Sequence, residues 1–147
     1  MTTSTTGRRW LVGPEDGAEH LLLDRLELRA GRVVGLHKHD GEEAHVVLSG
    51  TVRFLVDGVQ RVCGPGEVGF APIGAEHGFR ALSDAVLVTV REQRLGSIAI
   101  LLEPDGSRRE IPIYRNGPPW SNEPPAGAGP TPNEEIEAIY RTTAHLI

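Results

Sequence analysis

The chain has 147 residues, 39% of them hydrophobic, which is enough for one domain of ordinary size with a packed core. Its apolar runs, such as residues 98–102, are too short to cross a bilayer, and the first nine residues lack the apolar core of a secretory signal. Twenty acidic residues against fifteen basic ones give a formal charge of −5, so we expect neither a nucleic-acid nor a membrane partner. The single cysteine, Cys63, excludes an internal disulfide and agrees with a reducing, cytoplasmic location.

Residues 1–9 are predicted to be a disordered tail, because they are small, polar and charged. From residue 20 onward, apolar and polar residues alternate over short stretches, which is the period of half-buried β-strands. In the stretch 20–30, for example, Leu26 and Leu28 alternate with Arg25 and Glu27. The predicted strands are 20–30, 32–39, 43–48, 51–56, 59–63, 68–71, 78–81, 85–91, 98–102 and 109–113.

Turn residues separate these strands. Gly and Pro number 18 and 11, an unusually large share, and many of them fall between the apolar stretches. The dipeptide Asp57-Gly58 is typical of a two-residue hairpin turn, in which both residues need a positive φ. Many short strands with tight turns predict an all-β fold, a compact antiparallel barrel over residues 10–115.

The composition changes after residue 115. Residues 116–132 are rich in Gly and Pro and form a loop or arm, either a lid over the barrel or a contact with a second subunit. A short C-terminal helix follows and completes the segment 116–147, with Thr131 as N-cap, Pro132 at the first position and Glu134 closing a capping box. The apolar face of this helix is predicted to hold Ile136, Ile139, Tyr140 and Leu146.

Four of the six histidines lie within the predicted sheet region. His37 and His39 are two residues apart, so on a strand both imidazoles project from one face and can converge on one point. Glu43 opens the next strand after a short Gly-containing turn, and His77 follows a turn that can direct it inward. A single buried histidine is more often a hydrogen-bonded core residue, whereas three imidazoles with one carboxylate suit a first-row divalent ion such as Fe, Mn, Co, Ni, Cu or Zn.

The spacing of these residues resembles the two sequence motifs of the cupin superfamily. The first motif is complete, with Gly31, His37, His39, Glu43 and Gly50 at its positions. The second has Gly66, Pro72, Gly74 and His77, and ends in Ala81 where the family usually has Asn. Fifteen residues separate the motifs, and the resemblance covers about residues 20–91.

This resemblance implies a cupin-type double-stranded β-helix, a jelly-roll barrel with one divalent transition metal per chain. The ligands that it implies are His37, His39, Glu43 and His77. It also implies a homodimer formed through edge strands. A weaker similarity, based on the Pro-rich stretch and the C-terminal helix, is to bacterial quercetinase-type cupins, and it favours Fe(II) or Ni(II).

Residues near the motifs can complete a pocket for an organic substrate. His45 shares a strand face with Glu43, so it is either a pocket base and substrate contact or a hydrogen-bonded core residue. Three aromatic residues can form an apolar wall or ordinary core: Phe54, Phe70 and Phe79. Three strand arginines can hold a substrate carboxylate or face solvent: Arg53, Arg80 and Arg91.

The sequence thus leads to a metal-dependent enzyme for a small organic molecule, with Glu43 and His45 as catalytic residues. We expect a dioxygenase for an enol or phenolic substrate. The first alternative is a redox-neutral, metal-dependent cyclase or isomerase of the kind found in polyketide-type secondary metabolism. The second alternative is a cupin that binds a small ligand without catalysis.

Overall fold

The computed structural model of the chain describes residues 7–93, 96–114, 126–127 and 129–147. Within these ranges the regular elements are short strands, followed by one α-helix near the C-terminus. The strands are β1 (Arg8–Val12), β2 (Leu21–Leu28), β3 (Val33–His39), β4 (Glu43–Ser49), β5 (Val52–Val56), β6 (Val59–Cys63), β7 (Val68–Ala71), β8 (His77–Ala81), β9 (Ala85–Glu92), β10 (Ser97–Leu102) and β11 (Arg108–Ile113). The helix is α1 (Asn133–Thr143), and single 3₁₀ turns cover Pro14–Asp16 and Ala144–Leu146.

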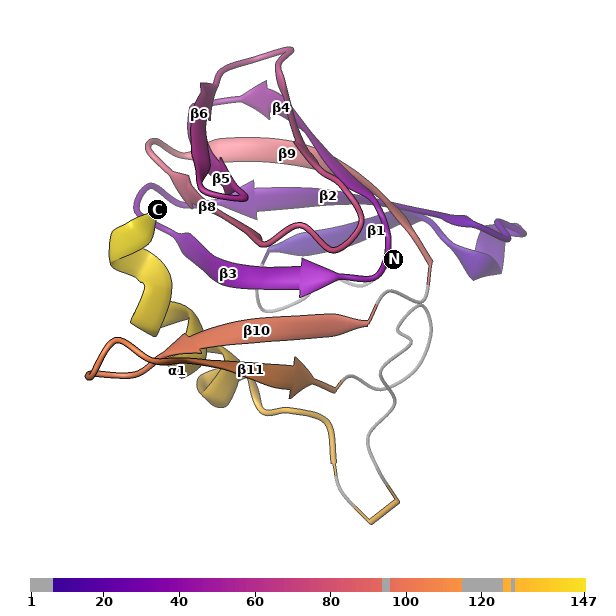
Figure 1. The fold of residues 1–147 in the computed structure, drawn as a ribbon. Coiled ribbons are helices and arrows are strands. Elements are labelled where there is room, and N and C mark those ends of the chain that lie inside the picture. Colours follow the sequence, from indigo (N-terminus) through magenta and orange to yellow (C-terminus); the bar gives the residue numbers. More distant parts are fainter. Residues whose placement is uncertain (1–6, 94–95, 115–125, 128) are drawn as a thin grey trace.

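The strands form two antiparallel sheets that face each other (Figure 1). One sheet has the order β1-β2-β9-β4-β7, and the other has the order β11-β10-β3-β8-β5-β6. Strands that are neighbours in a sheet are often distant in the sequence, as in a jelly roll. The predicted all-β jelly-roll fold with a short C-terminal helix is therefore confirmed.

The alternation in the sequence determines which side chains enter the barrel. In β2, Leu22, Leu26 and Leu28 point inward and are buried, as the period of two requires. The inward side chains of both sheets form the main core, which includes Val47, Val52, Phe54, Phe79 and Leu87. Asp24 follows the same alternation and is fully buried, so a carboxylate lies among these apolar side chains.

The hairpin between β5 and β6 confirms the prediction for Asp57-Gly58. Both residues have positive φ, 46° and 79°, and the two strands pair in register up to Val56 and Val59. This backbone twist matches the right-handed twist of the flanking strands, which is why such dipeptides favour the turn.

Helix α1 packs against β10 and β3 (Figure 1). Its inward residues Ile136, Ile139 and Tyr140 are buried against Ala99 and Ile113. None of the helices in the described part of the chain is long and apolar enough to cross a membrane.

The details of the helix differ from the sequence prediction. Pro132 is the N-cap, and the Thr131 hydroxyl accepts a hydrogen bond from the Tyr114 backbone N–H instead of capping the helix. Leu146 is 39% exposed, because the chain changes from α-helix to a 3₁₀ turn at Ala144 and so leaves the predicted face.

The N-terminal prediction also needs a correction. Strand β1 begins at Arg8, inside the segment predicted to be a tail, because the polar and charged residues there pair with the edge of β2. Residues 1–6 and most of the Gly/Pro-rich segment, including the choice between a lid and a dimer arm, lie outside the described residues.

Gly35 determines how closely α1 approaches the barrel. A Cβ at this position would lie 2.5 Å from the Tyr140 Cα and 2.7 Å from its carbonyl oxygen, both of which are backbone atoms that cannot turn aside. We therefore expect Gly35→Ala to lower the free energy of unfolding by about 2 kcal/mol through overpacking. Urea unfolding measures this, with Gly129→Ala as control, since no heavy atom of the described residues, apart from its chain neighbours, lies within 4 Å of that Cβ position. Equal stability of the two variants would contradict the close contact.

Candidate metal centre

Pairing between β3 and β8 brings the first two site residues together. His37 and His77 are directly opposite each other, with ring centroids 4.3 Å apart. His39 lies two residues further along β3 on the same face, with its ring centroid 4.9 Å from that of His37. Lys38 points the other way and forms an ion pair with Glu110, as the strand period predicts.

Glu43 reaches the same point from the opposite sheet. It is the first residue of β4 and is 3% exposed. One possible ligand atom from each of the four predicted residues lies within 4.8 Å of the others, and all four residues are buried. The structure therefore brings together the complete set that the sequence predicted, contributed by both sheets of the barrel: His37, His39, Glu43 and His77.

The three imidazoles are oriented in the same way. The Nδ1 atom of each lies at hydrogen-bond distance from a backbone carbonyl oxygen: 2.8 Å for His37 to Gly35, 2.9 Å for His39 to Gly96, and 2.8 Å for His77 to Ala75. A carbonyl oxygen only accepts, so the Nδ1 atoms carry the protons and the Nε2 lone pairs are available to a cation. Such outer contacts fix the tautomer and orientation of metal-binding histidines.

The carboxylate of Glu43 lies between these imidazoles. Oε2 is 3.3 Å from His39 Nε2, and Oε1 is 3.8 Å from His77 Nε2. Among the described residues, His77 Nε2 and Glu43 Oε2 are buried and have no hydrogen-bond partner. Buried polar atoms are rarely left unpaired, so these two atoms fit a site that would bind a cation.

The electrostatics of the site keep most of its ligands ready for a metal. Burial lowers the pKa of His39 to about 4, and burial with the neighbouring imidazoles holds the pKa of His37 well below its usual value. Burial would raise the pKa of Glu43, but His45 and Arg91 outweigh it and hold that pKa well below the ordinary range. For His77, burial is outweighed by the Glu43 carboxylate, which raises the pKa. Near neutral pH, His37 and His39 are therefore uncharged and Glu43 is ionised.

His45 also lies in the site. Its Nε2 is 2.6 Å from Glu43 Oε1, and its Nδ1 is 2.8 Å from the Thr89 hydroxyl. The ring contacts two buried aromatic side chains, with centroids 5.6 Å from Phe54 and 5.2 Å from Phe79. Two of the three predicted aromatic residues are thus next to the site, although both also belong to the main core.

The prediction for Phe70 is wrong. Phe70 pairs with Ala44, which lies between the inward residues Glu43 and His45 on β4 and so points outward. The Phe70 side chain is accordingly 49% exposed on the outer face of the barrel. Phe70 is close to Pro72 in the sequence, but this proximity does not determine the register of its strand, which turns the side chain outward.

Further polar residues lie around the site and belong to neither sequence motif. Thr89 and Asp24 are fully buried, on adjacent strands, and Tyr140 on α1 has its ring centroid 5.9 Å from that of His37. Arg91, one of the three arginines considered for a substrate carboxylate, is buried and directly opposite Glu43. The only available signal was the period of two, which places Asp24 and Arg91 on inward faces.

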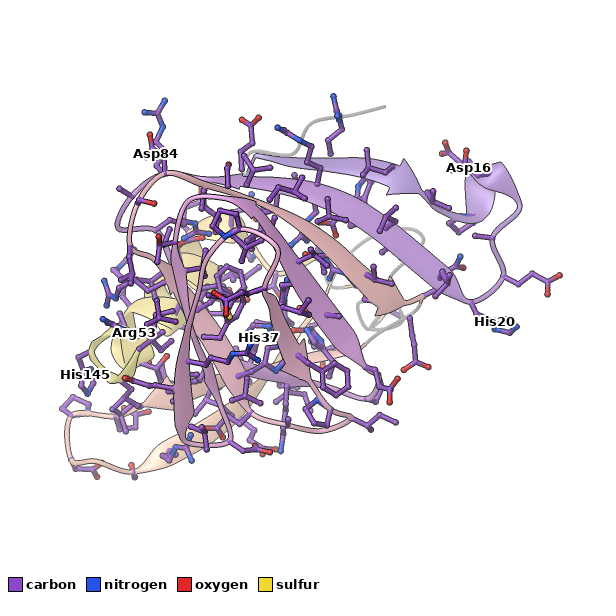
Figure 2. The ribbon with its side chains drawn as sticks, turned by 90° about the horizontal axis from the view of Figure 1, so that it is seen from above. Asp16, His20, His37, Arg53, Asp84 and His145 are labelled. Atoms are coloured by element: carbon purple, nitrogen blue, oxygen red, sulfur yellow. The ribbon has the colours of Figure 1, made fainter. Side chains whose placement is uncertain are left out.

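Two other histidines are far from this cluster. Figure 2 shows His37 among the strands, whereas His20 and His145 lie at opposite sides of the molecule. Both are exposed to solvent. Arg80 is also excluded from the site, because its guanidinium donates hydrogen bonds to the backbone carbonyls of Ile147 and Ala144.

Comparison with known proteins agrees with the fold described above. The family described as "Cupin domain" matches residues 24–91. No curated protein sequence is significantly similar to the chain. Among solved structures, KdgF from Halomonas sp. has a TM-score of 0.54 at 22% identity and covers 58% of this chain and 76% of its own. An RmlC-like cupin from Shewanella frigidimarina has a TM-score of 0.53 at 22% identity, with coverages of 58% and 73%.

A third similar structure is an enzyme that uses oxygen, the salicylate 1,2-dioxygenase of Pseudoaminobacter salicylatoxidans. Its complex with gentisate has a TM-score of 0.54 at 18% identity, covering 62% of this chain and 26% of the dioxygenase. At these identities the similarity concerns the fold alone. The family match thus identifies a cupin domain in residues 24–91 of this chain, and the two-sheet fold agrees with it.

Proposed function

We propose that the protein is a metal-dependent enzyme for a small organic molecule, most simply a dioxygenase for an enol or phenolic substrate. The observation that carries this proposal is the contact between His45 and Glu43, 2.6 Å apart, inside a buried cluster of three imidazoles and one carboxylate. The cluster supplies ligands for a cation, and the contact supplies a group that accepts a proton next to it.

The residues present fit a transition metal. Three Nε2 atoms and one carboxylate form a donor set that suits Fe, Ni, Zn and their neighbours, whereas Ca²⁺ and Mg²⁺ prefer more oxygens. Four protein ligands leave two positions of an octahedral ion open. When bound, such an ion supplies Lewis acidity and, in the case of iron or nickel, redox chemistry. Fe(II) or Ni(II) is the choice that accompanies the dioxygenase proposal.

The role of His45 and Glu43 in this proposal is to move a proton. An enol or phenol must lose its hydroxyl proton to become an electron-rich anion. The Glu43–His45 pair, which holds one proton across its 2.6 Å contact, can accept this second one. The Thr89 hydroxyl, 2.8 Å from His45 Nδ1, holds the imidazole in place during the transfer. Phe54 and Phe79 shield this pair from water on one side.

A redox-neutral cyclase or isomerase is the second candidate. The same observation favours it, since proton transfer between carbon and oxygen needs only a base and a Lewis acid. The difference between the two functions is oxygen, which a dioxygenase consumes and an isomerase does not. A cupin that only binds a ligand is the third candidate, and it returns that ligand unchanged.

The deciding experiment is metal analysis by plasma mass spectrometry on tag-free protein, followed by oxygen uptake with flavonoids and other enols. About one iron or nickel per chain together with oxygen uptake would support the dioxygenase. About one zinc, with product formed anaerobically, would support the cyclase or isomerase. No metal, even after anaerobic reconstitution, would overturn the enzyme proposal and leave a binding protein.

His77 provides a direct test of the metal site. We expect His77→Ala to lose most of its metal at equal loading, because one of four converging donors is removed. His20→Ala is the matched control, since His20 is exposed and outside the cluster. Both variants are dialysed against buffer that contains the metal, and the metal content per chain is then measured. Equal metal content in the two would place the ion elsewhere.

His45 separates catalysis from metal binding. We expect His45→Gln to keep its metal, because His45 is not one of the four converging ligands. Its turnover of an enol that the wild type converts should fall by about 10²-fold or more, the usual contribution of a positioned base. Steady-state oxygen uptake at matched metal content measures this. Unchanged turnover would remove His45 from the mechanism.

We also propose that the protein forms a homodimer through an edge strand and acts in the cytoplasm. Strand β7 lies at the edge of the five-stranded sheet, and its outward residues Val68 and Phe70 are 36% and 49% exposed. A second copy of the chain would cover these side chains by adding its own edge. The buried free thiol of Cys63 is compatible with a reducing compartment.

Phe70 tests the homodimer. We expect Phe70→Glu to convert a dimer into a monomer, because it places a charge in an apolar contact. Size-exclusion chromatography with light scattering measures the mass, and Ile73→Glu, 64% exposed in the loop after β7, is the control. A dimer that survives Phe70→Glu would exclude this edge.

A further inference from the structure

A buried ion pair lies directly behind the candidate metal ligand Glu43. The Arg91 guanidinium nitrogen Nη2 is 2.7 Å from Asp24 Oδ2, and both residues are buried. A buried ion pair is costly to desolvate and is weak evidence for stability. Its position beside the site therefore needs another explanation.

Arg91 faces Glu43 as well as Asp24. The two residues are opposite each other on β9 and β4, and Arg91 Nη1 is 3.9 Å from Glu43 Oε2. The same oxygen is 3.3 Å from His39 Nε2. One carboxylate oxygen thus has a fixed positive charge on one side and a candidate metal ligand on the other.

We propose that Arg91 is a positioning residue that competes with the metal ion for the Glu43 carboxylate, and that Asp24 limits this competition. The inference rests on the proposed function, and it deepens it. A cation behind Glu43 weakens the hold of this carboxylate on a second cation in front of it, because the two cations attract the same charge and repel each other. Glu43 then remains able to take a proton, which is the role that the proposed function gives it.

Asp24 determines how much of the Arg91 charge reaches Glu43. Its carboxylate is fully buried, accepts a hydrogen bond from Arg91 and lies 3.6 Å from Arg8 Nε. Removal of the Asp24 charge leaves Arg91 with one carboxylate fewer, and the local potential becomes more positive. Removal of both the Asp24 and the Arg91 charge also removes the guanidinium, which is the nearer of these two charges to Glu43.

These two changes have opposite expected effects, which a purely structural ion pair would not produce. We expect Asp24→Asn to bind Zn²⁺ about tenfold more weakly than the wild type, and the double variant Asp24→Asn/Arg91→Met to bind it more tightly than the wild type. Affinity is measured with Zn²⁺ alone, by competition with a chromophoric chelator. The readout does not depend on any substrate or activity.

The control is Glu27→Gln, which removes a carboxylate from the same strand as Asp24. Glu27 is exposed and pairs with Arg25 on the outside of the barrel, so its removal should leave the Zn²⁺ affinity unchanged. Thermal unfolding of the metal-free proteins confirms that each variant is folded. If Asp24→Asn is unstable, the double variant still tests the proposal, because it removes the Arg91 cation together with its closest carboxylate partner.

The order of affinities decides between the possibilities. A double variant that binds Zn²⁺ more weakly than the wild type, or as well as it, overturns the role of Arg91. Equal affinity of Asp24→Asn and the wild type overturns the role of Asp24. Failure of the wild type to bind Zn²⁺, Fe²⁺ or Ni²⁺ overturns the proposed function itself, and with it this inference.

Discussion

The central physical constraint in this protein is an ionised carboxylate inside a small barrel. Glu43 is buried, and an isolated buried carboxylate would take up a proton rather than remain charged. It remains ionised because His45 and Arg91 approach it from different strands. The register of β4 with β9 is thereby linked to the site: a shift by one residue would turn every inward side chain outward.

The barrel explains how residues from distant parts of the chain form one site. Strands β3 and β8 supply the histidines from one sheet, whereas β4 and β9 supply the acidic and basic groups from the other. The ligands therefore sit on strands that also form the core, and their orientation is fixed by backbone carbonyls rather than by long side chains. Such a rigid arrangement suits the proposed metal site.

Helix α1 links the C-terminus to the same site. The absence of a side chain at Gly35 lets the helix backbone come close to β3, and Tyr140 is placed beside His37. Hydrogen bonds from the Leu36 and Leu102 backbone N–H groups to threonine hydroxyls hold the helix in place. Helix α1 is consequently packed beside His37, and is not an appendage.

The sequence by itself determined an antiparallel β-barrel and the hairpin at Asp57-Gly58, because strand period and turn chemistry are local properties of the chain. The jelly-roll topology and the four converging residues were implied by the resemblance of its motifs to those of cupins. Only the tertiary structure decided which inward polar residues meet. Asp24 and Arg91 are 67 positions apart, and Phe70 points outward because of its pairing with Ala44. Cross-strand register depends on the packing of the whole barrel, so periodicity assigns a residue to a face but does not identify its neighbour. The cap of α1 was missed for the same reason, since the Thr131 hydroxyl bonds to Tyr114, a residue that precedes it by 17 positions.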